Sequence, residues 1–562
     1  MKLETFFEKF DQFADASDAV VRMRALVLNL AVQGRLVSNS RENPLSAEQI
    51  ASEKQQRLRE LNVRAHPETP QPTRDDFPFS LPQSWHAVAL GDLAFSCPTS
   101  YGEDPIPSLP KAGVVKVGNI DNQGGFKGHF AERGFLPDEI ESLLARRGDL
   151  MVVKSSGSAE NVHSGKTALC TAEHDGKIVG TNFVLRLRLL GTPALPEYVW
   201  RVLTSRYSRA WIEGTVQTMT YPNLKWSDFA RLPIPLPPLA EQKRIVAKVD
   251  ELMALCDRLE AQQQERETRH ATLARASLAR FADAPTPANL NFLFHESYAI
   301  PPADLRKSIL TLAVQGKLVP QDPKDEPATS LISQIAGEKR RLVAARIIRD
   351  KDEAAPITDD ELPFEVPYGW VWTRLSSITR RIHYGYTASA KTELRDVRML
   401  RITDIQNNFV DWASVPGCEI AEEDVAQYKL ERGDILVART GGTVGKTYLV
   451  QDVPVVAVFA SYLIRIQGGS ALFDRYLKIF LESPTYWVQL EEGARGAAQP
   501  NVNGQTLGRM VVSVPPLAEQ HRIVAKVDQL MALVDELEQQ LAASRATGEK
   551  LLEALVAELT AA

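Results

Sequence analysis

The sequence of 562 residues is poor in cysteine and has no long apolar run. Its four cysteines, Cys97, Cys170, Cys256 and Cys418, lie far apart without a C-x-x-C pair, which argues against a disulfide framework or a zinc site. No segment has the uncharged length needed to cross a bilayer, and the N-terminus lacks the apolar centre of a signal peptide. We therefore expect a cytoplasmic protein that makes no contact with a membrane.

Motifs of catalysis are also missing. The chain has no Asp/Asn-Pro-Pro-aromatic motif of amino-methyltransferases, no G-x-G-x-x-G after a strand, no H-E-x-x-H and no convincing Ser/His/Asp group. The histidines His129, His163, His174 and His383 are scattered, which favours surface or packing roles. We predict no catalytic residue, no metal ligand and no cofactor bound by this chain.

One segment, G-G-T-V-G-K-T at positions 441–447, looks like a phosphate-binding loop. A P-loop needs four residues between its first glycine and G-K-[ST], whereas Gly441 and Gly445 are separated by three. A loop between two strands that faces DNA, or simply a tight turn, explains this segment better than nucleotide binding.

The most informative feature present is an internal duplication. Positions 237–260 return as positions 515–538, and the two copies differ only at Lys243/His521, Glu251/Gln529, Cys256/Val534 and Arg258/Glu536. A repeat of this length determines the architecture before any local pattern does. We therefore expect a pseudo-twofold arrangement in which the two ends of the chain lie close together.

Each copy predicts a long helix. Two prolines suit the first turn, and Glu241 or Glu519 follows near the positive helix N-terminus. Apolar residues then alternate at spacings of four and three, at Ile245, Val249, Leu252, Cys256 and Leu259 and at Ile523, Val527, Leu530, Val534, Leu537 and Leu541. This seam is typical of a coiled coil. The alternative is an ordinary amphipathic helix that packs on a globular core.

A second repeat precedes each of the two globular regions. The segment L-A-V-Q-G-R-L-V at positions 30–37 recurs as L-A-V-Q-G-K-L-V at positions 312–319. Gly34 is a plausible cap for the helix before it, and a charged helix is expected to follow at 46–64 and at 330–352. The two helical blocks therefore repeat at the same distance from the long helices.

Between the helical blocks lie two regions that share a skeleton and differ in their loops. Each opens at a tryptophan, Trp85 or Trp370, and contains R-G-D-[LI]-[ML]-V and G-K-T segments among short β-branched runs. The predicted domains are 1–80, helical; 81–236, globular; 237–365, helical; 366–514, globular; and 515–562, a coiled-coil helix. The fold class is α+β, with two α/β domains separated by long helices that form an antiparallel coiled coil.

The paired P-P-L-A-E-Q-x-R-I-V-A-K-V-D and L-A-V-Q-G-[RK]-L-V blocks resemble the specificity subunit of Type I restriction-modification systems, over essentially the whole chain. The resemblance implies a DNA reader without catalytic activity, whose two target-recognition domains each read one half of a bipartite site in double-stranded DNA. It also implies two methyltransferase subunits as partners, with restriction subunits in the full enzyme. S-adenosylmethionine and ATP with Mg²⁺ would then be bound by those partners.

The candidate DNA contacts lie in aromatic-glycine loops and in polar segments after apolar strands. Arginine and lysine are the usual readers of guanine, and asparagine and glutamine of adenine. The predicted residues are Tyr101, Lys154, Ser155, Asn161, Lys166, Tyr221 and Asn223 in the first region and Tyr384, Tyr386, Arg439, Thr440, Lys446, Asn501, Asn503 and Gln505 in the second. For any one of them, a role as a solvated loop residue or turn former is an equally good interpretation.

Charge alone does not decide between DNA reading and another role. The chain has a net charge of −6, and each globular region carries 16 basic and 15 acidic side chains. We infer that much of the affinity for DNA comes from the partner subunits, while these regions supply base contacts. The alternative is a coiled-coil scaffold that joins two protein-binding domains and reads no DNA.

Overall fold

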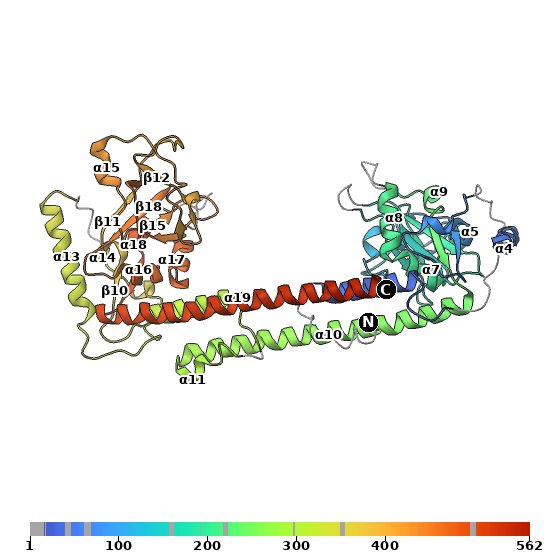
Figure 1. Cartoon of the computed structure of the whole chain (residues 1–562), viewed down its shortest axis with the longest axis horizontal. Helices are drawn as coiled ribbons and strands as arrows, with labels where there is room; N and C mark the ends of the chain where they lie inside the picture. The colour runs from blue at the N-terminus through green and yellow to red at the C-terminus, as the bar shows by residue number, and fades with distance from the viewer. Residues whose placement is uncertain are drawn as a thin grey trace. The chain divides into compact units, whose positions relative to one another are not determined.

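The computed structural model describes residues 16, 18–39, 47–60, 69–156, 162–191, 193–216, 223–295, 298–348, 355–494 and 502–561 (Figure 1). The chain divides into two compact units. Unit 1 consists of Met1–Glu265 and Arg545–Ala562, and unit 2 consists of Arg266–Ser544. The five domain boundaries expected from the sequence stay a prediction.

Unit 1 contains two N-terminal helices, a mixed α/β region, the first part of one long helix and the last part of another. Its helices are α3 (Ala19–Val32), α4 (Ala47–Glu60), α5 (Leu90–Leu93), α6 (Ile140–Leu143), α7 (Pro196–Leu203), α8 (Arg206–Val216), α9 (Trp226–Phe229) and the start of α10 (Leu239–Asp283). Its strands are β1 (His86–Ala89), β2 (Ala94–Cys97), β3 (Lys111–Val115), β4 (Ala131–Gly134), β5 (Leu150–Val153), β6 (Thr167–Leu169), β7 (Ile178–Gly180), β8 (Val184–Leu189) and β9 (Pro233–Leu236).

Unit 2 repeats this order with different loops. Its helices are α11 (Pro287–Leu290), α12 (Pro302–Val314), α13 (Ala328–Ala344), α14 (Leu375–Ile378), α15 (Glu422–Tyr428), α16 (Asp474–Phe480), α17 (Pro484–Ala494), α18 (Gly504–Arg509) and most of α19 (Leu517–Ala561). Its strands are β10 (Val371–Arg374), β11 (Thr379–Tyr384), β12 (Arg398–Leu400), β13 (Ile405–Gln406), β14 (Phe409–Val410), β15 (Ile435–Ala438), β16 (Thr447–Leu449), β17 (Ala457–Phe459), β18 (Leu463–Gly468) and β19 (Val511–Val514).

The central sheet has the same topology in both units. Its strand order is β2-β8-β5-β6 in unit 1 and β11-β18-β15-β16 in unit 2, with every pair antiparallel. A second sheet contains one parallel pair, β3 with β7 in unit 1 and β12 with β17 in unit 2. The chain therefore passes from the second sheet to the central sheet at the turn between β7 and β8, and again at the turn between β17 and β18.

The long helices α10 and α19, green and red in Figure 1, are each 45 residues long. Helix α10 begins in unit 1 and ends in unit 2, whereas α19 begins in unit 2 and ends in unit 1. The two equivalent helices thus run through the two units in opposite order. This agrees with the two domains and long helices that the duplication predicted. Among the described residues, no helix is long and apolar enough to cross a membrane.

The apolar seams of these helices lie in the cores of the two units. Ile245, Val249, Leu252 and Cys256 belong to a buried cluster that includes residues of α3, of the sheets and of the C-terminal end of α19. The matching residues Ile523, Val527, Leu530 and Val534 lie in the core of unit 2 together with residues of α12 and the far end of α10. The seam of each long helix is thus buried in a cluster that contains both the globular core and residues from the end of the other long helix.

The two ends of the chain meet inside unit 1. Arg35, just after α3, donates to the carbonyl of Leu559 near the end of α19, with 2.8 Å between the guanidinium Nη2 and the oxygen. Arg22 and Glu553 form an exposed ion pair with 3.7 Å between their charged atoms. The expectation that the ends lie close together is therefore confirmed for the described residues.

The repeated L-A-V-Q-G segment ends a helix and supports the tryptophan that opens each globular region. Gly34 has φ +71° and Gly316 has φ +69°, in the left-handed region that glycine adopts without strain. A side chain at Gly34 would collide with Pro82 and approach the Trp85 ring, and Gly316 meets Pro367 and Trp370 in the same way. The glycine therefore caps the helix and also leaves room for the proline and tryptophan.

Candidate nucleic-acid interface

The first helical turn of each long helix is bonded to the globular region through the repeated E-Q pair. The Trp85 indole N–H donates to the Glu241 carboxylate at 2.9 Å, and Trp370 donates to Glu519 at the same distance. Both carboxylates are buried, and burial raises the pKa of Glu519. The macrodipole interaction expected for these glutamates is thus accompanied by a buried hydrogen bond that fixes each sheet to its long helix.

Further bonds of this junction recur in both units. Tyr198 donates to the Pro235 carbonyl at 2.5 Å, and Tyr476 donates to the Ser513 carbonyl at 2.7 Å. At the surface, Arg201 pairs with Asp250 just as Arg475 pairs with Asp528. The frame that holds the loops is therefore the same in the two units, down to individual bonds.

In unit 1, the polar segment after β5 is held between two other loops. The Lys154 amide donates to the Phe183 carbonyl at 2.8 Å, and the Lys154 carbonyl accepts from the Leu224 amide at 2.7 Å. Ser155 and Asn223 form an antiparallel bridge beside them. We call this place, formed by Lys154, Ser155, Phe183 and Asn223, the corner of unit 1.

In unit 2, the segment after β15 is held in the same way. The Arg439 amide donates to the Tyr462 carbonyl at 3.0 Å, and the Arg439 carbonyl accepts from the Val502 amide at 3.2 Å. We call Arg439, Thr440, Tyr462 and Val502 the corner of unit 2. Each corner places a cation, a hydroxyl and an aromatic ring where three loops converge.

The aromatic-glycine loops adjoin the corners. In unit 2, the Arg439 guanidinium lies 4.8 Å from the centre of the Tyr384 ring, and the Tyr384 hydroxyl accepts from the Gly504 amide at 3.1 Å. In unit 1, the Tyr101 ring instead lies against Lys116 and Arg133, at 5.6 Å and 5.0 Å from its centre. The sequence-predicted residues Tyr384 and Arg439 are thus in contact, whereas Tyr101 faces the second sheet.

The other predicted residues have more varied surroundings. Tyr386 is half-buried, pairs with Ala460 and lies 5.3 Å from the Tyr428 ring. The side-chain oxygen of Asn503 accepts from the amides of Gln505 and Thr506 and caps α18. Gln505, in the first turn of that helix, is exposed. Asn161, Tyr221 and Asn501 lie outside the described residues. Base contact by any of the predicted residues stays a prediction.

The G-K-T segments form tight turns that precede β6 and β16. Gly165 and Gly445 have φ +89° and +81°, and their amides donate to the Val153 and Ala438 carbonyls. A side chain at Gly165 would meet Ile212 of α8, and one at Gly445 would meet Leu490 of α17. The glycine amides are already bonded to the last residues of β5 and β15. These amides are therefore not presented to a phosphate group as the amides of a P-loop are.

Lys166, in the turn of unit 1, belongs to a basic cluster. Burial lowers the pKa of Lys166, and the neighbouring charges of Arg209 and Lys127 lower it further. The matching Lys446 of unit 2 is exposed. Asp121 acts on the pKa of Lys166 in the opposite sense, and Arg209 pairs with Glu213 at 2.7 Å, so the positive charge of this cluster is partly balanced.

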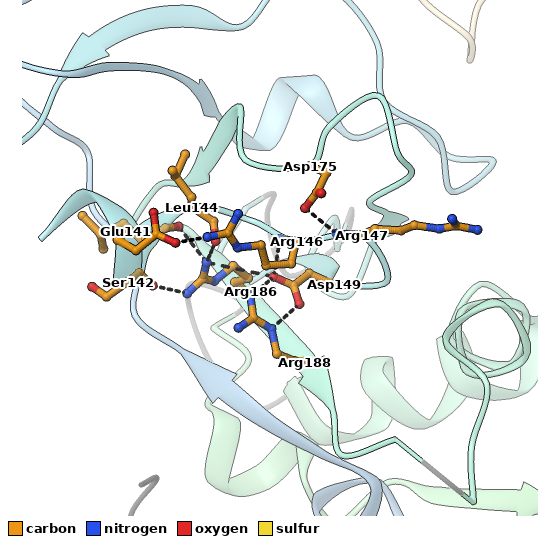
Figure 2. A network of polar contacts seen from close by, with 10 residues as sticks. Glu141, Ser142, Leu144, Arg146, Arg147, Asp149, Asp175, Arg186 and Arg188 are labelled. Atoms are coloured by element: carbon orange, nitrogen blue, oxygen red, sulfur yellow. Dashed lines mark hydrogen bonds and ion pairs between the residues drawn. The ribbon is translucent and has the colours of Figure 1, made fainter. Parts of the chain in front are cut away.

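A buried polar network supports the strands that end at the corner of unit 1 (Figure 2). Asp149 of the R-G-D segment is 1% exposed and accepts from Arg188 at 2.7 Å and 2.8 Å and from the Arg146 amide at 2.9 Å. The hydrogen bond to Asp149 raises the pKa of Arg188. Arg186, also 1% exposed, donates to the carbonyls of Ser142, Leu143 and Leu144 and lies 4.0 Å from Asp149.

Unit 2 contains the counterpart of this network. Arg465 donates to Asp434 at 3.1 Å and to the carbonyls of Gln427 and Lys429, and both members of the ion pair are buried. Burial raises the pKa of Asp434, against the opposing effect of Arg465. R-G-D was a point shared by the two regions in the sequence, and the buried arginine beside its aspartate was not predicted. One arginine stands inside an apolar strand of each unit, in V-L-R-L and in L-I-R-I. An arginine at such a position is the sequence signal for a buried acidic partner.

The remaining predictions of absence concern metals and disulfides. All four cysteines are free and buried. Within the described ranges, no group of three or more histidine, cysteine, aspartate or glutamate side chains is placed to hold a metal ion. The candidate sites in the described part of the chain are the two corners.

Comparison with known proteins finds a matching family model and several similar proteins. A family model described as the Type I restriction modification DNA specificity domain matches residues 193–267 and 374–544. The Type I restriction enzyme EcoAI specificity subunit of Escherichia coli is 28% identical, over 95% of this chain and 93% of that protein. The chain is similar to the Type I restriction specificity subunits over nearly its whole length. The EcoEI specificity subunit of Escherichia coli is a further relative at 27% identity, over 95% of this chain and 93% of its own length.

Solved structures are similar to the chain as well. The HsdS subunit from Thermoanaerobacter tengcongensis is 20% identical, with a TM-score of 0.43, and the match covers 86% of this chain and 98% of that chain. A second similar chain comes from a structure that describes the assembly and conformational transition of the type I R-M system. It is 18% identical, with a TM-score of 0.49, and the match covers 86% of this chain and 99% of that chain.

Proposed function

We propose that this chain is a specificity subunit that reads a bipartite DNA site, with the corner of unit 1 on one half-site and the corner of unit 2 on the other. The observation that carries the proposal is the repetition of the corner. In both units a cation follows the central strand, and its amide and carbonyl are held by the same two neighbouring loops. The frame around it is nearly identical, while the side chains differ, as two readers of different sequences require.

The chain contributes recognition and no catalysis. Its relatives are specificity subunits, and the matching family model is a DNA specificity domain. The near-neutral globular regions supply too little positive charge to hold DNA by phosphate contacts alone. Methyltransferase subunits therefore provide much of the affinity, and they bind S-adenosylmethionine. Restriction subunits, where present, bind ATP with Mg²⁺.

Selective binding by the assembled complex tests this function. The chain mixed with its methyltransferase subunits should prefer one duplex sequence over random competitor DNA. The Arg439→Ala variant should lose about 1 to 3 kcal/mol of discrimination in the second half-site only, because a cation that contacts a base edge is worth about that much. Binding is measured by competition at fixed salt. The exposed Lys391, which pairs with Glu419, provides the control variant Lys391→Ala.

Two outcomes would contradict this function. If the wild-type complex assembles but binds all duplexes equally, the chain is a scaffold that joins partner proteins. If Arg439→Ala weakens binding to every sequence by the same factor, Arg439 contacts phosphate and the base reader of unit 2 lies elsewhere.

The duplicated frame also predicts the number of partners. The first turns of α10 and α19 differ at few positions, and each carries the same bonds to its globular region. A repeated surface presents a repeated site, so we expect two methyltransferase subunits for each chain. Native mass spectrometry of the methyltransferase complex should give this ratio. A stable one-to-one complex at saturating partner would show that the repeat only braces the fold.

A further inference from the structure

A second aromatic residue occupies the same place in both corners. Phe183 is 57% exposed and Tyr462 is 63% exposed. Each stands directly before the strand that contains the buried arginine, Arg186 in β8 or Arg465 in β18. Neither residue was predicted from the sequence, because a lone aromatic before an apolar strand is an ordinary core pattern.

The backbone of these aromatic residues is fixed from two directions. Their carbonyls accept from the amides of Lys154 and Arg439, as described above. On the other side, the aromatic-glycine loops bond to the same turns, through the Ser100 amide to the Gly180 carbonyl and the Gly385 amide to the Leu463 carbonyl. Each ring is therefore carried by a rigidly bonded turn, between the strand-end cation and the aromatic-glycine loop.

Neither side chain contributes to the folded core. Phe183 and Tyr462 are absent from all the apolar clusters formed by the described residues. One exposed aromatic residue on a surface needs no explanation. Two of them at equivalent positions of a duplicated unit, each beside the cation proposed to contact DNA, indicate a shared purpose for the exposed ring.

We propose that Phe183 and Tyr462 each contact the C5-methyl group of a thymine in the major groove, one in each half-site. The proposal rests on the DNA-reading function above and adds a specific residue to each corner. An aromatic face can contact the thymine methyl, which cytosine lacks and which a hydrogen bond does not detect. The neighbouring cation would read or hold the adjoining base pair, so that the ring and the cation together specify a short sequence.

The experiment uses the chain assembled with its methyltransferase subunits and a duplex library with both half-sites randomised. Phe183→Ala should reduce the preference for thymine at one base pair of the first half-site by about fourfold, since one buried methyl group is worth roughly 0.8 kcal/mol. Tyr462→Ala should do the same in the second half-site. The control variants are Leu136→Ala and Val488→Ala, which remove exposed apolar side chains away from the corners.

Uracil in place of the selected thymine separates this contact from other effects. The wild-type complex should lose about fourfold in affinity on the uracil duplex, because only the methyl group is removed, and the matching alanine variant should lose nothing further. Equal losses for wild type and variant, or an unchanged thymine preference in the variants, would overturn the proposal. A wild-type complex without any sequence preference would instead overturn the DNA-reading function itself.

Discussion

Exchange of residues 90–232 for those of a relative with a different target should replace one half of the recognised DNA site and leave the other half unchanged. The exchange lies inside the β1–β9 pair, where the Leu90 amide donates to the Leu232 carbonyl, so the frame of unit 1 stays intact. Because specific binding exceeds non-specific binding by at least about 10³-fold, affinity for the original site should fall by about that factor or more. Sequencing of methylated host DNA reads both half-sites at once.

The exchange has design requirements and a reciprocal control. The donor must keep the bonds that cross the boundary, from Tyr198 to the Pro235 carbonyl and from Arg201 to Asp250. The matching exchange in unit 2 covers residues 375–510, because the Leu375 amide donates to the Met510 carbonyl. It should alter the second half-site only. A change in both half-sites after either exchange would show that the two units do not read independently.

Asp434→Ala should destabilise unit 2 by about 3 to 5 kcal/mol, because it leaves the Arg465 charge buried without a counterion. Asp434 also accepts from Gln467 at 3.1 Å and from the Glu431 amide at 2.9 Å, and both donors would lose their partner. The free energy of unfolding is measured by denaturant titration of the chain. The loss should also reduce selectivity at the second half-site, since β15 and β18 carry the corner.

A double variant and a surface variant are the controls for Asp434→Ala. Asp434→Leu combined with Arg465→Met removes both charges and should cost less than the single change, because no uncompensated charge remains. Asp528→Ala breaks the half-exposed pair with Arg475 and should cost at most about 1 kcal/mol. If Asp434→Ala were as mild as Asp528→Ala, the buried network would not hold the strands as described.

The frame was predictable from the sequence because its information is local and repeated. The prolines at 237–238 and 515–516 predict the start of each long helix, and α10 and α19 begin at Leu239 and Leu517. Gly34 was expected to cap a helix, and its positive φ confirms this. These features depend on backbone conformation near one residue, which neighbouring residues largely determine.

The supporting contacts depend on residues far apart in the sequence, and they were not predicted. Glu241 was assigned to the helix macrodipole, but its buried partner is Trp85, 156 positions earlier. The exposure that Phe183 shares with Tyr462 depends on how the strands and loops fold, which the sequence pattern does not show. Periodicity also could not show what the seam at Ile245 packs against, since a core and a second helix bury an apolar stripe equally well.

The DNA-contact residues were partly accessible to sequence reasoning. A polar residue directly after an apolar strand is placed at the strand end, and this located Lys154 and Arg439 at the corners. Asn503 illustrates the ambiguity, because the asparagine that suits an adenine also suits a helix N-cap, and its side-chain oxygen caps α18. Loop conformation decides which groups face outward, and short-range patterns do not encode it.

The measurement that tests the central claim most directly is methylome sequencing of a host that carries this chain with its methyltransferase subunits. We predict a motif of two short specified segments, separated by an unspecified spacer of constant length, because two separate corners read DNA from one continuous frame. A single contiguous motif, or a spacer that varies among methylated sites, would contradict recognition by two units.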